Sequence, residues 1–214
     1  MNAGVNEQTL ALDELFASEF PIEEKAVTLL SGQNVVRGEV LGLVQIGAIG
    51  TPSAVTGTGN GTCAGTIVAG KHVKAGTYTV RCIGAVTNLG DFVLIDPDGI
   101  VVGTLKVGTA STLSTHLNGI LVSDGATDFV VGDYFTIAVA VGSLKAKAYD
   151  KDNVDGSAHA VGIAVEDCDA SAADVVTSMY VAGCFKYSQL TYPTSDTGFL
   201  ADFLKTPVII KENL

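Results

Sequence analysis

The segment Asp91-Phe92-Val93-Leu94-Ile95-Asp96-Pro97-Asp98-Gly99-Ile100-Val101-Val102-Gly103-Thr104-Leu105-Lys106-Val107 decides the fold class of this sequence. Two apolar runs rich in β-branched residues flank a turn, in which proline fixes φ and glycine accepts a positive φ. This pattern predicts a tight hairpin between two strands.

Further strands are predicted on both sides of the hairpin. Before it, residues 76–83 alternate, which places Tyr78, Val80 and Cys82 on one face of a strand. After it come apolar runs at 117–122, 129–131 and 134–141, each bounded by turn residues. Strands of this length and spacing predict a β-sandwich.

The glycines divide the chain into regions. Residues 56–142 hold 15 of the 25 glycines, and the composition shifts near both ends of this stretch. We therefore predict that residues 56–142 form an inserted β domain, and that residues 26–55 and 143–214 form one discontinuous domain around it. Residues 1–25 are predicted to be an N-terminal arm.

The outer regions carry their own elements. Residues 36–42 partly alternate as in a half-buried strand, and Gly38 and Gly42 within them suggest a bulge or a close backbone approach. Strands are also predicted at 158–165 and 175–185, and an edge strand at 206–211. A short helix is predicted at 196–204, capped by Asp196 or Thr197.

The N-terminal arm has a short apolar stripe. Leu12, Leu15 and Phe16 are spaced as on one face of a helix, which Phe20-Pro21 would end. Such a helix either packs on its own domain or docks on a neighbouring chain. Docking is favoured, because residues 2–8 are polar and the stripe is too short to fold alone. Leu12, Leu15, Phe16 and Phe20 are therefore the candidate contact residues.

The composition excludes several classes of protein. Apolar residues make up 47% of the chain and charged residues 16%, which argues against disorder. The net charge of −11 argues against nucleic acid as a partner, because phosphates require clustered Lys and Arg. No apolar run is long enough to span a membrane, and the acidic N-terminus is unlike an export signal, so we expect synthesis in the cytoplasm.

The sequence offers no catalytic site, cofactor site or metal site. The histidines His72, His116 and His159 lack partners at metal-ligand spacing, and the cysteines Cys63, Cys82, Cys168 and Cys184 form no CxxC pair. Buried free thiols are expected for the cysteines. Residues 150–156 resemble the start of a calcium loop, but the twelfth position is Val161 rather than Glu, so a solvated turn is favoured. We therefore expect a protein that is not an enzyme.

Several outer segments together resemble the head decoration proteins of tailed bacteriophages, the family of the lambda decoration protein. The segments that carry the resemblance are Ser31-Gly32-Gln33, Arg37-Gly38-Glu39-Val40-Leu41-Gly42, Tyr149-Asp150, Asp155-Gly156-Ser157-Ala158-His159-Ala160-Val161-Gly162-Ile163-Ala164 and Val181-Ala182-Gly183-Cys184-Phe185. They cover about a third of the chain, and their order and spacing agree with the family once 56–142 is set aside. Members are usually near half this length, so the insert is a departure from the pattern. Within it, residues 76–107 more weakly resemble an immunoglobulin-like β module of phage structural proteins.

The resemblance implies a mostly β protein. Its decoration domain would be small and tulip-like, interrupted by a β-sandwich and preceded by an extended arm. It further implies a homotrimer on the outer surface of the virion capsid, bound to the major capsid protein and clamping the mature shell, with no active site. Extra trimer contacts or weak glycan binding are expected roles for the insert.

Two other functions stay open from the sequence alone. The chain could be another virion β protein, such as a tail-tube or baseplate subunit. It could also be a surface β-sandwich that binds carbohydrate, which would require export from the cell. Neither alternative adds a catalytic residue, a cofactor or a membrane partner.

Overall fold

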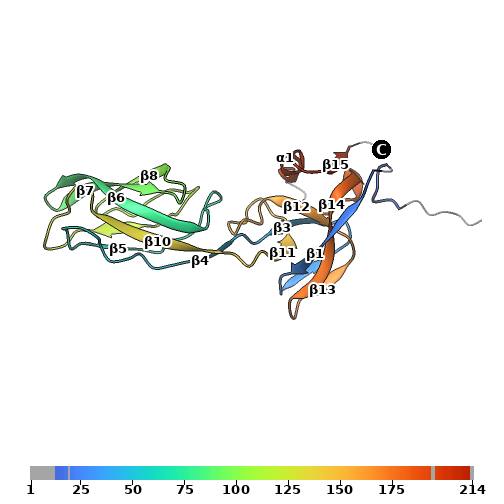
Figure 1. The fold of residues 1–214 in the computed structure, drawn as a ribbon, viewed down its shortest axis with the longest axis horizontal. Helices are drawn as coiled ribbons and strands as arrows, with labels where there is room; N and C mark the ends of the chain where they lie inside the picture. Colours follow the sequence, from blue (N-terminus) through green and yellow to red (C-terminus); the bar gives the residue numbers. More distant parts are fainter. Residues whose placement is uncertain (1–12, 19, 194–195, 213–214) are drawn as a thin grey trace, which may run out of the picture.

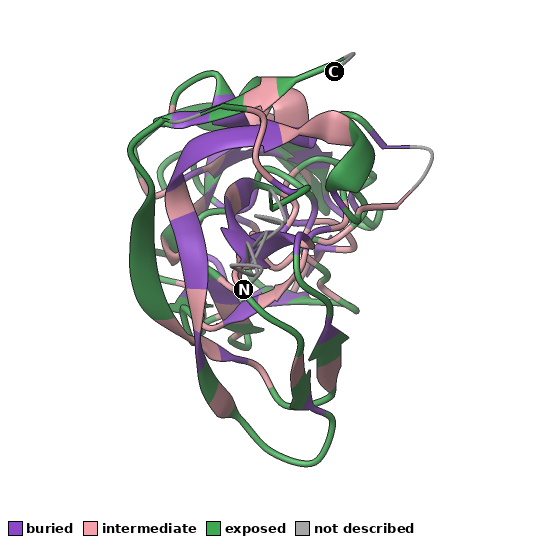
Figure 2. Ribbon diagram, turned by 90° about the vertical axis from the view of Figure 1, so that its right-hand side faces the viewer, coloured by how far each residue is buried: buried purple, intermediate pink, exposed green. Residues whose placement is uncertain are grey.

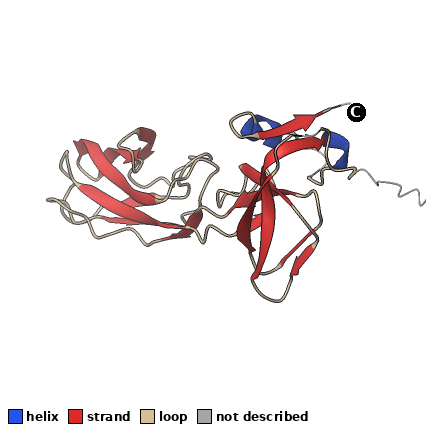
Figure 3. Ribbon diagram, turned by 45° about the vertical axis from the view of Figure 1, so that its right-hand side comes forward, coloured by secondary structure: helices blue, strands red, loops and turns tan. Residues whose placement is uncertain are grey.

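A computed structural model describes residues 13–18, 20–193 and 196–212. The chain is mostly β and forms two lobes along its long axis (Figure 1). We call them the closed-sheet lobe (residues 13–44 and 143–212) and the five-stranded lobe (residues 45–142). The described helical residues, a 3₁₀ turn at Tyr187–Gln189 and α1 at Phe199–Phe203, all belong to the closed-sheet lobe (Figure 3).

The closed-sheet lobe is built on a six-stranded sheet with the order β1-β11-β3-β12-β14-β15. Its strands are β1 (Glu23–Leu29), β3 (Val40–Leu43), β11 (Ala146–Ala148), β12 (Ala160–Ala164), β14 (Val175–Lys186) and β15 (Val208–Lys211). Because β1 also pairs with β14, five of these strands close into a ring and β15 extends the sheet beyond it. A separate ribbon pairs β2 (Gln33–Val35) with β13 (Cys168–Ala170).

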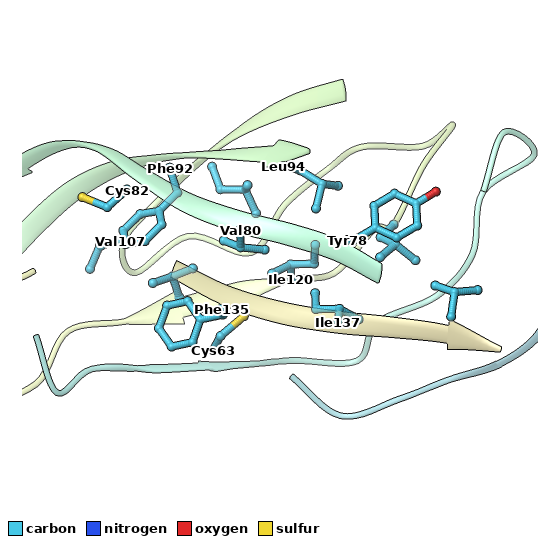
Figure 4. Packing of buried hydrophobic residues seen from close by; sticks show 14 of the residues in the cluster. Cys63, Tyr78, Val80, Cys82, Phe92, Leu94, Val107, Ile120, Phe135 and Ile137 are labelled. Atoms are coloured by element: carbon cyan, nitrogen blue, oxygen red, sulfur yellow. The ribbon is translucent and has the colours of Figure 1, made fainter. Parts of the chain in front are cut away.

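The five-stranded lobe contains an antiparallel sheet with the order β4-β10-β6-β7-β8. Its strands are β4 (Ile46–Ile49), β6 (Gly76–Val86), β7 (Leu89–Ile95), β8 (Val101–Lys106) and β10 (Tyr134–Val141). The pair formed by β5 (Thr62–Ala64) and β9 (Leu121–Ser123) contributes to the opposite side of the core. Phe92 and Phe135 from the sheet pack with residues such as Cys63 and Ile120 (Figure 4).

The hairpin that decided the fold class is confirmed. Gly99 has φ +82, and the carboxylate of Asp96 accepts the N–H groups of Asp98 at 3.0 Å and Ile100 at 2.8 Å. The predicted core face of β6 is also confirmed, because Tyr78, Val80 and Cys82 are all buried.

Several predicted elements were wrong in extent. Of the runs at 117–122 and 129–131, only Leu121–Ser123 enters a strand, because Leu117, Ile120 and Phe129 fill the core from loops. The strand predicted at 36–42 begins only at Val40, after a turn. The C-terminal helix starts at Phe199 with Gly198 as its N-cap, and no side chain caps it.

A close backbone approach at Gly42 is confirmed. A Cβ atom at this position would lie 2.1 Å from the carbonyl oxygen of Ser157. Only glycine therefore allows β3 to lie this close to the 150–157 loop.

The chain crosses between the lobes as two adjacent segments. Val44 donates its N–H to the Lys145 carbonyl at 3.0 Å, and Leu144 donates to the Val44 carbonyl at 2.8 Å. Because β4 pairs with β10, the segment after Gln45 already belongs to the five-stranded sheet. We therefore propose domain boundaries near residues 45 and 142, the first of which lies earlier than the predicted residue 55.

Candidate functional site

The N-terminal segment lies at the end of the closed-sheet lobe that points away from the five-stranded lobe (Figure 1). Ala17 donates its N–H to the Cys184 carbonyl at 2.8 Å, and Lys186 donates to the Leu15 carbonyl at 3.0 Å. Residues 15–17 thus continue the edge of β14 along which β1 pairs. We call this end of the lobe, with residues 13–22 and 199–212, the pole.

The predicted amphipathic helix is not formed by the described part of this segment. Glu14 and Leu15 lie in a turn instead, and Phe16 forms an antiparallel bridge with Phe185. The physical reason is that the edge of β14 offers main-chain hydrogen bonds that a helix of this length cannot match. Leu12 lies outside the described residues.

Two of the predicted contact residues pack into their own lobe. Leu15 is only 4% exposed. The ring of Phe16 lies 5.3 Å from that of Phe185 and 5.4 Å from that of Tyr180, measured between centroids. Leu15 and Phe16 therefore anchor the segment to the lobe, whereas the side chain of Phe20 is 38% exposed.

An ion pair fixes the start of the described segment. The guanidinium of Arg37 bonds the carboxylate of Asp13 and also donates from Nε to the Val165 carbonyl at 3.2 Å. The hydrogen bond from Arg37 lowers the pKa of Asp13 below its ordinary value. No local pattern predicts this pair, because residues 13 and 37 meet only through the fold.

Exposed apolar side chains gather at the pole. Phe20 and Ile22 come from the N-terminal segment, and Ile22 is 50% exposed. From the C-terminal part come Leu204, 86% exposed, and Ile209 on β15. Figure 2 views the molecule from this end and shows exposed segments around a buried interior.

A groove of about 510 Å³ runs between α1 and β15 at the pole. It is lined mainly by aliphatic and aromatic side chains, among them Leu200, Phe203, Leu204, Val208 and Ile209. Among the strands in the described ranges, β15 pairs only with β14, so its second edge is available to another strand. Ile22, Leu204 and Ile209 were not selected as candidate contact residues from the sequence. For Ile209 a signal was present, because it is an apolar residue within the edge strand predicted at 206–211.

The other candidate groups do not form a reactive site. His72 and His116, distant in sequence, meet edge to face with ring centroids 5.8 Å apart, while His159 lies 3.4 Å from Asp202. All four cysteines are free, and burial raises the pKa of Cys63 to about 11, which disfavours its reactive thiolate. Within residues 13–18, 20–193 and 196–212, no cluster of three or more His, Cys, Asp or Glu side chains could hold a metal ion.

The loop at 150–157 is held by its own carboxylates. Asp150 accepts the N–H of Asp152 at 2.9 Å, and Asp155 binds both Ser157 and Lys147. These contacts hold the segment in a turn, which is the structure that the sequence favoured here.

No helix in the described part of the chain has the length and apolarity needed to cross a membrane.

Comparison with known proteins points to a protein family. A family model described as "Bacteriophage lambda head decoration protein D" matches residues 5–198. No curated protein and no solved structure matches the chain. The matched range covers the five-stranded lobe and the closed-sheet lobe up to the start of α1, and of the pole it covers residues 13–22 but not 199–212.

Proposed function

The chain belongs to the family of bacteriophage lambda head decoration protein D, and from this premise we propose that it binds the outer surface of a tailed-phage capsid as a homotrimer and stabilises the mature shell. The family match over residues 5–198 carries the proposal. The partner is the major capsid protein, and the role is structural rather than catalytic.

The pole supports the proposal as the surface that faces the shell. Phe20, Ile22 and Leu204 expose apolar area there, and the five-stranded lobe lies at the opposite end of the molecule. Exposed apolar side chains grouped at one end of a molecule are typical of protein interfaces. With the pole on the shell, the five-stranded lobe projects outward, where contacts with neighbouring copies or with glycans remain its expected role.

The proposed contact arm consists of the residues upstream of Asp13, including Leu12, together with Phe20. Leu15 and Phe16 hold its base against β14. An arm that adds a strand to a capsid edge gains main-chain hydrogen bonds without special side-chain chemistry. A protein that binds only the mature lattice stabilises that lattice by mass action.

The test uses purified expanded capsids that lack their decoration protein. We expect the full chain to sediment with them saturably and to raise the temperature at which the shells break. Deletion of residues 1–12 should weaken binding about tenfold or more. Deletion of residues 1–12 tests the arm more specifically than removal of residues 1–25. The longer deletion would also remove the start of β1 at Glu23 and the core residue Leu15.

A matched control separates folding from binding. Val131→Ser alters an exposed aliphatic side chain of the five-stranded lobe and should leave capsid binding unchanged. Circular dichroism should give the same melting curve for the deletion and the full chain. Failure of the full chain to bind expanded shells would overturn the proposed function, and full binding by the deletion variant would overturn the role of the arm.

A further inference from the structure

A groove beside the 150–157 loop takes no part in the proposed function. It has a volume of about 430 Å³, and most of its lining side chains are polar. They come from β2, the segment before β3, the loop and the segment after the 3₁₀ turn, and they include Gln33, Glu39, Asp150, Asn153 and Tyr192. We call it the Tyr192 groove. None of its lining residues belongs to the pole.

Two side-chain amides in the Tyr192 groove are held at one end only. The side-chain oxygen of Gln33 accepts the N–H of Ala148 at 3.2 Å, and that of Asn153 lies 3.5 Å from the ammonium of Lys147. Lys147 also lies 3.2 Å from the carboxylate of Asp155. The NH₂ groups of both amides have no hydrogen bond in the described part of the chain. Each amide can therefore donate to a ligand without losing a contact within the protein.

The groove also contains an acceptor that lacks a cation. Glu39 is partly buried, and one of its carboxylate oxygens accepts the N–H of Val36 at 2.9 Å. It forms no ion pair with the described residues, and burial raises the pKa of Glu39 above its ordinary value. A carboxylate that loses hydration without gaining a cation is stabilised by a ligand that donates hydrogen bonds to its second oxygen.

One wall of the groove is an aromatic ring in a fixed position. The ring centroid of Tyr192 lies 4.7 Å from that of Phe199 and 5.4 Å from that of Tyr187. Tyr192 is itself only partly buried, so it adds apolar ring surface beside the polar groups. In the five-stranded lobe, by contrast, four of the five aromatic residues are buried, namely Tyr78, Phe92, Phe129 and Phe135.

This combination of groups selects the class of ligand. Glu39 and Asp150 repel an anion, and the ammonium of Lys147 repels a cation, so a neutral ligand is favoured. An apolar protein segment would bury Glu39 without giving it a hydrogen-bond donor, which costs free energy. A saccharide meets each requirement, because its hydroxyl groups both donate and accept and the C–H face of a hexose ring packs against an aromatic side chain.

We infer that the Tyr192 groove binds a neutral saccharide composed of hexose units. Tyr192 packs against one face of a sugar ring, Glu39 accepts hydrogen bonds from its hydroxyl groups, and Gln33 and Asn153 donate to them. The inference goes beyond the proposed function, because binding to a shell at the pole does not depend on this groove. It also differs from glycan binding by the five-stranded lobe, where Tyr134 is a partly exposed ring.

The test screens the full chain on a printed array of short glucose, galactose, mannose and N-acetylglucosamine oligomers. The oligomer that binds best is then titrated by isothermal titration calorimetry up to about 10 mM. Tyr192→Ala removes the ring and should raise the dissociation constant about tenfold or more. Glu39→Gln replaces an acceptor oxygen with a donor and should raise it about fivefold or more. Because Glu39→Gln removes a desolvated charge without a cation, its melting temperature should not fall.

Two matched controls complete the experiment. Tyr134→Ala removes a partly exposed ring from the five-stranded lobe, and Glu166→Gln neutralises an exposed carboxylate outside the groove. Both should bind the saccharide like the unaltered chain. If neither groove variant weakens binding, or if the unaltered chain binds none of the oligomers, the inference is wrong. Loss of binding in Tyr134→Ala alone would assign the saccharide to the five-stranded lobe instead.

Sedimentation with expanded capsids separates this inference from the proposed function. All four variants should sediment with the shells like the unaltered chain. A chain that binds shells but no saccharide would overturn only the inference, whereas a chain that binds saccharide but no shells would overturn only the proposed function.

Discussion

The two lobes are both built from β-strands, but they are connected very differently. In the five-stranded lobe, β6, β7 and β8 are consecutive in the chain and adjacent in the sheet. In the closed-sheet lobe, the ring is completed by β1 and β14, which pair Glu24 with Tyr180. The first arrangement follows from local turn chemistry, whereas the second requires the ends of the chain to meet after the other lobe has been traversed.

The cores of the lobes are also separate. One cluster of buried residues, including Phe92 and Phe135, fills the five-stranded lobe. The closed-sheet lobe has an aromatic cluster around Phe185 and Phe199 and a second one of smaller residues around Leu29. Because no cluster includes residues of both lobes, we expect each lobe to unfold as its own cooperative unit.

The largest effect is expected from removing one aromatic side chain from each core. Phe185→Ala and Phe135→Ala each delete a fully buried ring and should each cost about 3–5 kcal/mol of unfolding free energy. Differential scanning calorimetry should resolve two transitions, of which Phe185→Ala lowers only the one for the closed-sheet lobe. Phe135→Ala should lower only the other.

These two variants control for each other, because they remove the same chemical group. A single transition that both substitutions shift equally would contradict separate unfolding and would join the lobes into one cooperative unit.

The same contrast explains what the sequence could predict. The hairpin around Asp96-Pro97-Asp98-Gly99 and the buried face of β6 were predictable, because each depends on neighbouring residues. The loop positions of Leu117 and Phe129 were not, since an apolar run has the same pattern whether it fills a core from a strand or from a loop.

The site was less predictable than the fold. An apolar stripe at Leu15 and Phe16 marked residues that matter, but their spacing suggested a helix and an outward role. Their actual partners, Tyr180 and Phe185, lie near the other end of the chain, and no local rule could bring them together. The positive φ of Leu144, +56, is likewise held by backbone hydrogen bonds to Val44 that only the fold supplies.

A smaller effect, confined to the five-stranded lobe, is expected from Asp133→Asn. The carboxylate of Asp133 accepts the N–H groups of Thr58, Gly59 and Val130, each at 2.9 Å. The asparagine amide has one oxygen that accepts and an NH₂ group that only donates, so it cannot keep all three hydrogen bonds. We expect the free energy of unfolding to fall by about 1–3 kcal/mol. Only the transition of the five-stranded lobe should move.

Lowering the pH should remove the same stabilisation by the Asp133 carboxylate from the unaltered chain. Burial acts to raise the pKa of Asp133, but the three backbone donors outweigh it and the pKa lies below its ordinary value. Its contribution is therefore full at neutral pH and is lost as the pH falls below about 4 toward the lowered pKa. Melting measured from pH 7 to pH 2 should show a smaller loss in Asp133→Asn, and equal losses would exclude this carboxylate as the cause.

The smallest effect is expected at the contact between the lobes. Lys71 of the five-stranded lobe lies 2.9 Å from the carboxylate of Asp152 in the closed-sheet lobe, and both side chains are exposed. Asp152→Asn should leave both melting transitions in place, because exposed ion pairs add little stability. It should broaden the distribution of distances between spin labels attached one to each lobe. Glu166→Gln should not, because this exposed carboxylate of the closed-sheet lobe has no ion pair among the described residues. Hydrogen bonds from Lys151 and Lys71 lower the pKa of Asp152 to about 2, so the contact should persist at pH 4. It should weaken in about 1 M salt, where screening acts over about 3 Å. If neither the substitution nor the salt changes the distance distribution, the ion pair does not restrain the lobes. The paired segments at Val44 and Leu144 would then alone set the orientation of the five-stranded lobe relative to the closed-sheet lobe.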